Sequence, residues 1–326
     1  MSKGVHRFAV LVACATFFLI IAGANVTSHD AGLATSDWPL SNGSLFPKMV
    51  GNLFWEHGHR MVATGVGILT VVFNLYVWEI DIRLAGLLKR VFGRVQAEHN
   101  YRRERRSWMR WFAFSALGVV IAQGLLGGLT VKMNLPLAVS AAHATLAQLF
   151  FLITVSLAVF TSRGWRDQEA RLAENGGPSV RSLGVVALVA ILAQLVLGAT
   201  LRHSATWDQD LPTSLLLAHL GGALVVTLIL GFTIMSVLLR YRAEKYLAKP
   251  AVIAAVLLFA QLGLGLAAYI TRVRSPYDPQ PLTPMVAVTV AHVACGALVF
   301  ATTIVLTLRA FRVLRTDRKE YALAAA

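Results

Sequence analysis

The sequence predicts an all-α polytopic membrane protein whose eight transmembrane helices form two pseudo-symmetric four-helix bundles. Its composition is the first reason, because 56% of the residues are hydrophobic and only 14% are charged, whereas a soluble domain carries about 25% charged residues. The second reason is a series of apolar runs of about 20 residues, the length that crosses a bilayer as a helix. The third is a repeated helical hairpin that carries one histidine each time.

The apolar runs follow one another along the whole chain. A cleaved signal peptide is disfavoured for the first run, because its apolar stretch is too long for a signal sequence and the hairpin repeat needs it as a helix. The expected helices are residues 8–27, 52–78, 111–131, 137–161, 183–201, 212–239, 250–271 and 283–311. The repeat divides them into a first bundle in residues 1–161, a cytoplasmic linker at 162–182 and a second bundle in residues 183–326.

The basic residues are concentrated on one side of the predicted membrane. Of the 30 Lys and Arg residues, 24 lie in the N-terminal segment, in the loops after the second, fourth and sixth helices, or near the C-terminus. This asymmetry predicts that both termini are cytoplasmic. The net charge of +14 is therefore attributed to topology and to lipid-headgroup contact rather than to nucleic-acid binding.

The outgoing helix of each hairpin carries a glycine, and three of the four carry a glutamine one turn before it. The pairs are Gln123 with Gly127, Gln194 with Gly198, and Gln261 with Gly265. The first helix has Gly23 but carries Leu19 in place of the glutamine. The glycine permits close helix approach, and the glutamine can hydrogen-bond across the contact. We favour a packing role for these pairs, with a ligand role for the glutamines as the alternative.

Each returning helix carries one histidine in its outer half. The intervals are Pro136 to His143, Pro212 to His219, Pro284 to His292 and, over a longer distance, Pro47 to His59. Each histidine is expected about 10 Å below the outer end of its helix, at 1.5 Å rise per residue. Ionisable residues at membrane depth indicate function. The repeat predicts two pairs, His59 with His143 and His219 with His292.

Such pairs suit haem iron, because two imidazoles can approach a planar cofactor from opposite sides of an apolar four-helix core. Zinc usually takes four ligands, and helices 212–239 and 283–311 offer no carboxylate beside their histidines. Purely structural hydrogen bonding is a weaker explanation for four matched residues. A proton relay is weaker still, because residues at one depth form no chain across the membrane.

The second helix differs from the other returning helices by reading Glu56-His57-Gly58-His59-Arg60. Glu56 lies one turn before His59 and four residues before Arg60. Its carboxylate is expected either to form a local ion pair with Arg60 or to act as an acid/base group beside a reactive haem. His57 faces another side of the helix and is expected at the membrane interface.

The remaining arginines, histidines and cysteines have simpler interpretations. Arg202, Arg272 and Arg274 follow two outgoing helices at the outer end, where they can pair with haem propionates or extend toward the interface. The remaining histidines, His6, His29, His99 and His203, lie at helix ends or in loops and are interpreted as incidental. Cys14 and Cys295 are expected to fill apolar space.

These residues together resemble the haem A synthase family of cytochrome oxidase assembly. The matching features are the Glu56-x-x-His59-Arg60 motif, the single histidines of the later returning helices, and the outer loop from Gly32 to Gly43. The resemblance covers all eight helices. It implies a low-spin haem b held by His219 and His292, and a haem O substrate site with His59 and His143 near the iron. It also implies that Glu56 is needed for turnover.

The implied reaction oxidises the C8 methyl group of haem O to a formyl group by successive hydroxylation and loss of water. The resemblance further implies that Arg60, Arg202, Arg272 and Arg274 contact the cofactors, and that the protein lies in the cell inner membrane with its haem sites toward the outer face. The expected partners are haem O, haem A, haem O synthase, an electron donor and membrane lipid. Nucleic acid is not expected, and assembly into a homo-oligomer is left open.

One feature departs from the family pattern. Many bacterial members have a pair of cysteines in the first outer loop, and this chain has Thr35 and Ser41 where that pair is expected. No disulfide can form there, so a role of that pair in redox transfer or loop stability does not carry over. Two other functions share the four histidines: a di-haem b-type cytochrome that only passes electrons, and a haem chaperone or transporter. Neither gives a reason for Glu56.

Overall fold

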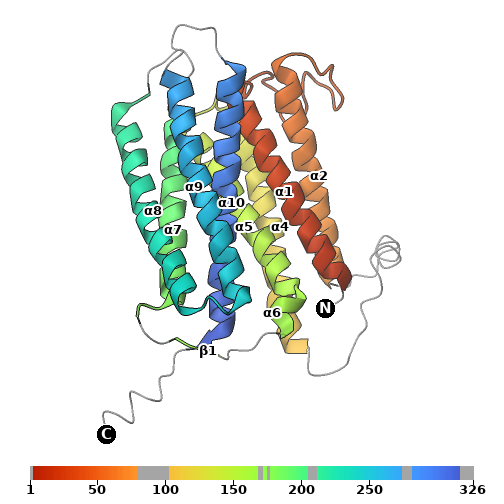
Figure 1. Ribbon diagram of the computed structural model, residues 1–326. Coiled ribbons are helices and arrows are strands. Elements are labelled where there is room, and N and C mark those ends of the chain that lie inside the picture. Colours follow the sequence, from red (N-terminus) through yellow and green to blue (C-terminus); the bar gives the residue numbers. More distant parts are fainter. Residues whose placement is uncertain are drawn as a thin grey trace.

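The computed structural model is a bundle of long, roughly parallel and antiparallel helices (Figure 1). It describes residues 3–78, 103–167, 172–174, 177–204, 211–273 and 281–315. In these ranges eight helices are long and apolar enough to cross a membrane, which confirms the predicted fold class. They are α1 (Lys3–Ser28), α2 (Asn52–Trp78), α4 (Arg103–Lys132), α5 (Leu137–Thr161), α7 (Val180–His203), α8 (Thr213–Arg240), α9 (Lys245–Val273) and α10 (Thr283–Val313).

Most helix ends agree with the prediction to within a few residues, but α1, α4 and α9 begin earlier than expected. Helix α1 starts at Lys3 rather than residue 8. Helix α4 starts at Arg103 rather than residue 111, and α9 starts at Lys245 rather than residue 250. Hydropathy marks only the part of a helix that lies in hydrocarbon. The backbone can stay helical beyond that part because basic side chains such as Arg and Lys are good helix formers.

The apolar interior is divided into two main clusters that follow the chain. One cluster belongs to α7–α10 and includes Val180, Leu230, Leu247, Phe300 and Leu306. The other belongs to α1, α2, α4 and α5 and includes Phe8, Val66, Phe73, Ala113 and Phe150. A third, smaller cluster joins the two halves and consists of Ile20, Phe151, Ala297 and Ala301. This division is consistent with two four-helix bundles that share one interface.

Four helices form the contact between the halves, with α1 and α5 of the first half against α7 and α10 of the second. Figure 1 shows α10 beside α5 near the centre of the molecule. At the outer end the contact is also polar, because the guanidinium of Arg202 in α7 donates a hydrogen bond of 2.6 Å to the main-chain oxygen of Thr27 in α1. The two halves are therefore fixed relative to each other near the depth of the histidines.

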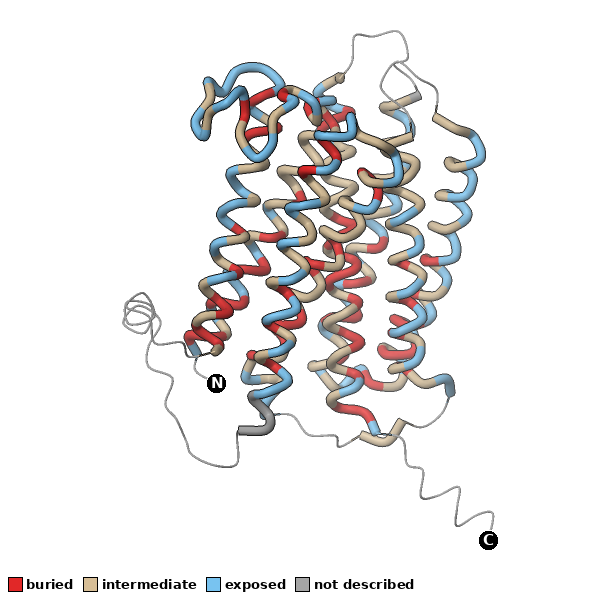
Figure 2. The backbone as a smooth tube through the Cα atoms, turned by 180° about the vertical axis from the view of Figure 1, so that it is seen from behind, coloured by how far each residue is buried: buried red, intermediate tan, exposed pale blue. Residues whose placement is uncertain are grey.

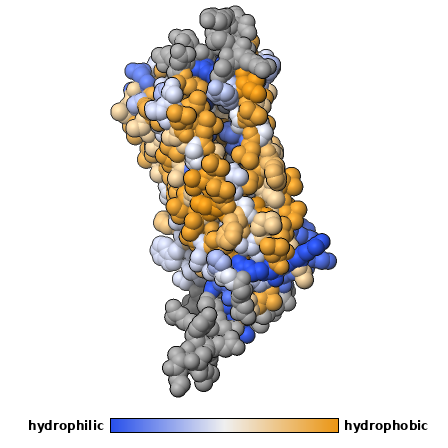
Figure 3. All heavy atoms as spheres, turned by 60° about the vertical axis from the view of Figure 1, so that its left-hand side comes forward, coloured by the Kyte–Doolittle hydropathy of each residue, from blue (hydrophilic) through white to orange (hydrophobic). Residues whose placement is uncertain are grey.

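The outward-facing surface of the bundle is apolar along its length. Figure 3 shows a hydrophobic belt with hydrophilic residues gathered toward the ends of the molecule. Exposed residues of this belt include Leu220, Leu228, Phe232, Phe259 and Leu266. Large apolar side chains exposed at this density mark a surface that contacts lipid rather than water.

The predicted linker at 162–182 contains a short helix, α6 (Arg163–Asp167), and a two-residue strand, β1 (Leu172–Ala173). Strand β1 pairs in parallel with β2 (Leu314–Arg315), directly after α10. Glu174, next to β1, forms an ion pair of 2.9 Å with Arg181 at the start of α7. The first residues of α1 and the last residues of α10 lie at this same end of the bundle (Figure 1), as the charge pattern predicts for two cytoplasmic termini.

Candidate functional site

Each of the four membrane histidines packs against the glycine of the helix that precedes it. A Cβ atom placed on the glycine would lie 3.1 Å from Cε1 of His59 for Gly23, 3.0 Å from Cε1 of His143 for Gly127, 2.9 Å from Cε1 of His219 for Gly198, and 3.1 Å from Cε1 of His292 for Gly265. The glycines were predicted to allow close helix approach. The structure shows that the space at each glycine is occupied by one imidazole ring per hairpin.

Replacing Gly198 by alanine should therefore disturb His219 more than it disturbs the fold. The added methyl would lie 2.9 Å from the imidazole, closer than van der Waals contact allows, so the ring must turn away. We expect the variant to insert and fold but to bind less haem per protein, measured by absorbance after purification. Gly221→Ala on α8 is the control, because a Cβ there meets nothing within 4 Å. Equal haem content in the two variants would contradict the prediction.

His219 and His292 face each other across the second bundle. Their ring centroids are 6.5 Å apart and their planes are 70° from parallel. A metal ion bound between two imidazoles, with metal–nitrogen bonds of about 2 Å on each side, places the ring centroids about 6 Å apart. The observed separation matches that arrangement. Helices α7 to α10 contain no Asp or Glu, so the pair lies in an apolar, carboxylate-free core.

The nature of the donors also favours a haem over a bare ion. No group of three or more His, Cys, Asp or Glu side chains able to hold a metal ion occurs among the described residues. Haem iron needs only one or two protein ligands because the macrocycle supplies the others. In addition, Nδ1 of His292 is buried without a hydrogen-bond partner in the described structure. The second-bundle pair therefore fits the haem expected there.

His59 and His143 form the corresponding pair in the first bundle. His143 is close enough to His59 to act on it electrostatically, and Nδ1 of each ring is buried without a partner in the part of the chain that the structure describes. Glu56 lies one turn before His59 and is only 4% exposed. The structure thus brings the three predicted catalytic residues into one region, whereas the second bundle has no acidic counterpart.

The Glu56 carboxylate is held from two directions. Its Oε1 forms an ion pair with the guanidinium of Arg60, and its Oε2 accepts a hydrogen bond of 3.0 Å from the main-chain N–H of Thr35 in the outer loop. The predicted Glu56–Arg60 pair is therefore confirmed. The Glu56 side chain is buried and that of Arg60 is mostly covered, at 5% and 14% exposure, so the pair is costly to place there without further partners.

Arg60 connects this pair to the outer loop. Its Nη1 donates hydrogen bonds of 2.8 Å to the main-chain oxygen of Asp37 and 2.6 Å to that of Leu40. The sequence suggested that Arg60 contacts a cofactor. The structure places it instead between the carboxylate and the loop, so a direct cofactor contact stays a prediction. Hydrogen bonds therefore join the outer loop, Arg60 and Glu56, one turn from His59 on α2.

Thr35 and Ser41, where the family resemblance led us to expect a cysteine pair, are both buried, at 4% and 0% exposure. The hydroxyl of Ser41 lies 2.8 Å from Nδ1 of His57, and that of Thr35 accepts the main-chain N–H groups of Asp37 and Asn42, each at 3.3 Å. Hydrogen bonds of the Thr35 and Ser41 side chains thus hold this loop together and attach it to α2, where no disulfide can form. Figure 2 shows buried residues within this loop at the top of the bundle.

The expectation that His57 is interfacial was wrong, because the loop folds back over the start of α2 and leaves His57 only 5% exposed. Helical periodicity could show which side of α2 His57 occupies but not what would cover that side. The loop also contacts α4, where the Trp38 ring packs so closely on Gly128 that a Cβ there would lie 2.7 Å from it. The loop therefore bridges two helices of the first bundle.

Replacing Ser41 by alanine should loosen this loop. The change leaves Nδ1 of the buried His57 without its 2.8 Å partner, and an unsatisfied buried polar group costs about 1–3 kcal/mol. We expect a lower midpoint in thermal unfolding and faster proteolysis between α1 and α2. Ser44→Ala is the control, because the Ser44 hydroxyl makes only an exposed contact with the Phe46 N–H. Identical cleavage rates in the two variants would contradict a stabilising role of Ser41.

The structure shows contacts for only some of the arginines at the outer end. Arg202 is near enough to Arg272 to interact with it electrostatically, which gathers positive charge at the outer end of the second bundle, and it also reaches across to Thr27. The contact with Thr27 was not predicted, since it depends on how the halves pack. Arg274 lies outside the described residues. The predicted contact of these arginines with propionates stays a prediction.

The three glutamines contact the histidines. Nε2 of Gln123 lies 3.3 Å from Nε2 of His143 and donates a 3.0 Å bond to its main-chain oxygen. Nε2 of Gln194 lies closer to the other ring nitrogen of His219, at 3.0 Å from Nδ1 and 3.5 Å from Nε2, and donates a 2.8 Å bond to its main-chain oxygen. Nε2 of Gln261 lies 3.2 Å from Nε2 of His292. The sequence favoured a role in helix packing, but the glutamines also contact these histidines directly. The signal was present, because each glutamine lies one turn before the glycine that its histidine touches.

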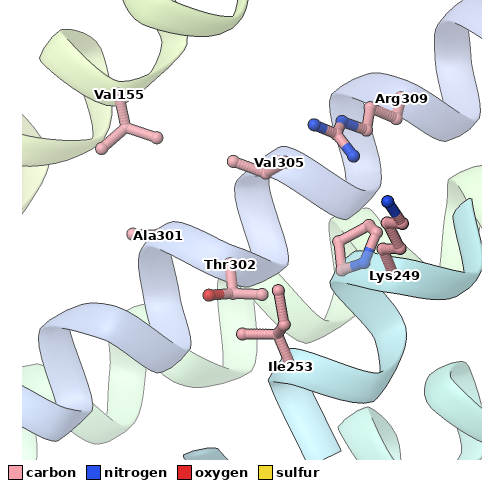
Figure 4. A pocket seen from close by; sticks show the side chains of 8 residues that line it. Val155, Lys249, Ile253, Ala301, Thr302, Val305 and Arg309 are labelled. Carbon is pink, nitrogen blue, oxygen red and sulfur yellow. The ribbon is translucent and has the colours of Figure 1, made fainter. Parts of the chain in front are cut away.

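A groove of about 320 Å³ lies elsewhere, between α5, α9 and α10. Figure 4 shows Lys249 and Arg309 at one side of it and apolar side chains, among them Ile253 and Val305, along the rest. It lies toward the opposite end of α9 and α10 from Gly265 and His292, and none of the four histidines lines it. The groove is therefore separate from the candidate site.

Comparison with known proteins finds similarity to proteins of cytochrome oxidase assembly and haem A synthesis. Residues 49–207 match the family model COX15-CtaA, described as cytochrome oxidase assembly protein. Haem A synthase of Shouchella clausii is 24% identical over 291 residues, 83% of this chain and 88% of that protein. Haem A synthase of Caulobacter sp. is 32% identical over 47% of this chain and 39% of that protein. Haem A synthase of Bacillus licheniformis is 31% identical over 80 residues, which span 24% of this chain and 26% of that protein.

Proposed function

We propose that the chain is a haem A synthase, from the premise that residues 49–207 match the model of the cytochrome oxidase assembly protein family. In this proposal it oxidises the C8 methyl group of haem O to a formyl group and so supplies haem A for cytochrome oxidase. The observation that carries the proposal is the ion pair of the buried Glu56 with Arg60, one turn before His59. A carboxylate at this place has no counterpart in the second bundle.

The second bundle is proposed to hold the resident cofactor. His219 and His292 would bind the iron of a haem b from opposite sides, as their 6.5 Å separation allows. The haem supplies one-electron chemistry when it is bound. Arg202 and Arg272 lie at the outer end of this bundle, where their charges would favour the carboxylates of a haem edge.

The first bundle is proposed to hold the substrate. His59 and His143 orient haem O, and the apolar cluster around Phe73 and Phe150 excludes water from below. The N–H of Thr35 and the guanidinium of Arg60 fix the position of the Glu56 carboxylate. A carboxylate fixed in this way can accept or return a proton at one place during oxidation of the methyl group.

The two alternative functions explain less of the structure. An electron-passing di-haem cytochrome and a haem chaperone would both use His59 and His143, but neither needs a buried carboxylate held by an arginine and a loop. Burial of such a pair is costly unless it serves a purpose. The site of Glu56 therefore favours chemistry over electron transfer or storage alone.

The proposed location in the cell follows from the hydropathy and charge pattern of the chain. The eight apolar helices make this a multi-pass membrane protein. We place it in the cell inner membrane with both termini cytoplasmic and the histidines toward the outer face. Haem O synthase as the source of substrate and an electron donor are the proposed partners, and nucleic acid is not one. Association into a homo-oligomer is not part of the proposal.

The test is to purify the protein after co-expression with a source of haem O and to extract its pigment. Haem A in the extract, identified by chromatography and mass, is the expected result. Extraction of haem b alone, together with unimpaired oxidase assembly in a Glu56→Ala strain, would refute the synthase proposal and favour the cytochrome. Recovery of unaltered haem O would favour the chaperone.

A further inference from the structure

The groove between α5, α9 and α10 is charged at one end only. Of the residues that line it, Lys249 and Arg309 are charged, both are basic, and the others are apolar apart from Thr302. Lys249 lies one turn after the first residue of α9, and Arg309 lies one turn before the last residue of α10. The ends of spanning helices lie near the lipid head groups. The groove therefore presents two positive charges at head-group depth.

The protein supplies no negative charge to these two side chains. Lys249 is exposed, and it forms no hydrogen bond or ion pair with another residue in the part of the chain that the structure describes. Nη1 of Arg309 donates a hydrogen bond of 3.1 Å to the main-chain oxygen of Tyr246. The Arg309 Nε is buried without a partner among the described residues. Glu244, just before α9, does not line the groove, and its carboxylate accepts the main-chain N–H of Tyr246.

Aromatic and basic side chains surround the charged end of the groove. The guanidinium of Arg309 lies 4.3 Å from the centre of the Tyr246 ring. Nε of Arg312 donates a 2.9 Å hydrogen bond to the main-chain oxygen of Trp165, and its guanidinium lies 5.5 Å from the centre of that ring. Trp and Tyr are enriched where a membrane meets water. Basic pockets between transmembrane helices on the cytoplasmic side bind anionic head groups.

The apolar part of the groove follows α10 away from the charged end. Val305 and Ala301 lie one and two turns before Arg309, which extends the apolar part by about 12 Å at 1.5 Å rise per residue. Val155 of α5 and Ile253 of α9 line it from the neighbouring helices (Figure 4). An elongated apolar slot that ends in two cations matches the polarity of a phospholipid, whose charged head group adjoins an acyl chain.

We propose that this groove binds an anionic phospholipid, with its phosphate between Lys249 and Arg309 and one acyl chain along Val305 and Ala301. The head group decides which lipid binds, because the chains of all lipids are as apolar as the groove. Two basic residues favour a head group with a net negative charge over a zwitterionic one. The inference goes beyond the proposed function and does not depend on it.

A lipid in this groove contacts both halves of the protein. Val155 belongs to α5 of the first half, whereas the other lining residues belong to α9 and α10 of the second. A ligand that binds the folded state and not the unfolded one stabilises the folded state. The bound lipid therefore raises the midpoint of thermal unfolding, and the increase depends on the lipid concentration.

The first experiment titrates phosphatidylglycerol into the purified full-length protein in a neutral detergent and counts bound lipid by native mass spectrometry. We expect one tightly held phosphatidylglycerol and a higher unfolding midpoint, whereas phosphatidylcholine and inorganic phosphate at equal concentration give neither. Lys249→Gln should weaken the binding about fivefold, which corresponds to about 1 kcal/mol for one basic residue. Arg242→Gln is the matched control, because Arg242 is an exposed basic residue between α8 and α9 that does not line the groove.

The second experiment fills the groove without changing its charge. Ile253→Trp places a large ring in the apolar part and should abolish retention of phosphatidylglycerol. Val252→Trp is its control, because Val252 is the adjacent residue of α9, is exposed to a similar degree (50% against 52%) and does not line the groove. Both variants should keep the unfolding midpoint that the wild type shows without added lipid.

Three results would overturn the inference. The first is equal affinity of Lys249→Gln and Arg242→Gln for phosphatidylglycerol. The second is binding of phosphatidylcholine as tight as that of phosphatidylglycerol, and the third is the same stabilisation by inorganic phosphate alone, which would assign the two cations to a free anion. None of these results bears on the formation of haem A, so failure of this inference is distinguishable from failure of the synthase proposal.

Discussion

Replacing Glu56 by glutamine is expected to lower haem A formation by about 10²–10⁴-fold, the range typical for loss of a positioned acid/base group, while the resident haem stays bound. Glutamine keeps the size of the side chain and can still accept the Thr35 N–H at Oε1. It cannot exchange a proton or balance the charge of Arg60. The measurement is haem A per bound haem b in protein co-expressed with a haem O source.

The control for this prediction is Glu174→Gln. Glu174 is also a carboxylate paired with an arginine, Arg181, at 2.9 Å, but it lies beside β1, at the end of the bundle where α7 begins. It should lose stability and keep its haem A yield. If Glu56→Gln made as much haem A as the control, the carboxylate would be a structural partner of Arg60 and not an acid or base.

Replacing His219 or His292 by alanine should remove the resident haem. Each replacement removes one of the two facing imidazoles. Loss of a group that only orients a metal ligand lowers metal affinity about 10–100-fold, so loss of the ligand itself should lower the affinity for haem at least as much. We expect the low-spin haem b spectrum to disappear from the purified variants. His59→Ala and His143→Ala should retain it, because they lie in the other bundle.

The control here is His6→Ala. His6 lies near the first residues of α1, where its Nδ1 is 3.1 Å from the main-chain oxygen of Ala158, at the end of the bundle remote from the four histidines. It should bind haem as the wild type does. Full retention of haem b in both His219→Ala and His292→Ala would mean that the ligands are elsewhere, and the division of roles between the bundles would fail.

Hydropathy was sufficient to predict the eight helices, whereas the side of the basic loops and the common depth of the four histidines stay predictions. These properties can be read locally, because a helix in hydrocarbon satisfies its own backbone and only its length and polarity decide where it begins and ends. The Glu56–Arg60 pair was predictable for the same reason, since both residues lie four apart on one helix.

Long-range packing decided what local patterns could not. The burial of His57 depends on a loop that folds back from α1, and the contact of Arg202 with Thr27 depends on how two halves of the chain meet. The glutamines were visible in the sequence, but their role depends on the rotation of one helix against another, which brings each amide to an imidazole. The sequence places one histidine in each hairpin, and the four differ in their partners because helix packing sets those partners one hairpin at a time.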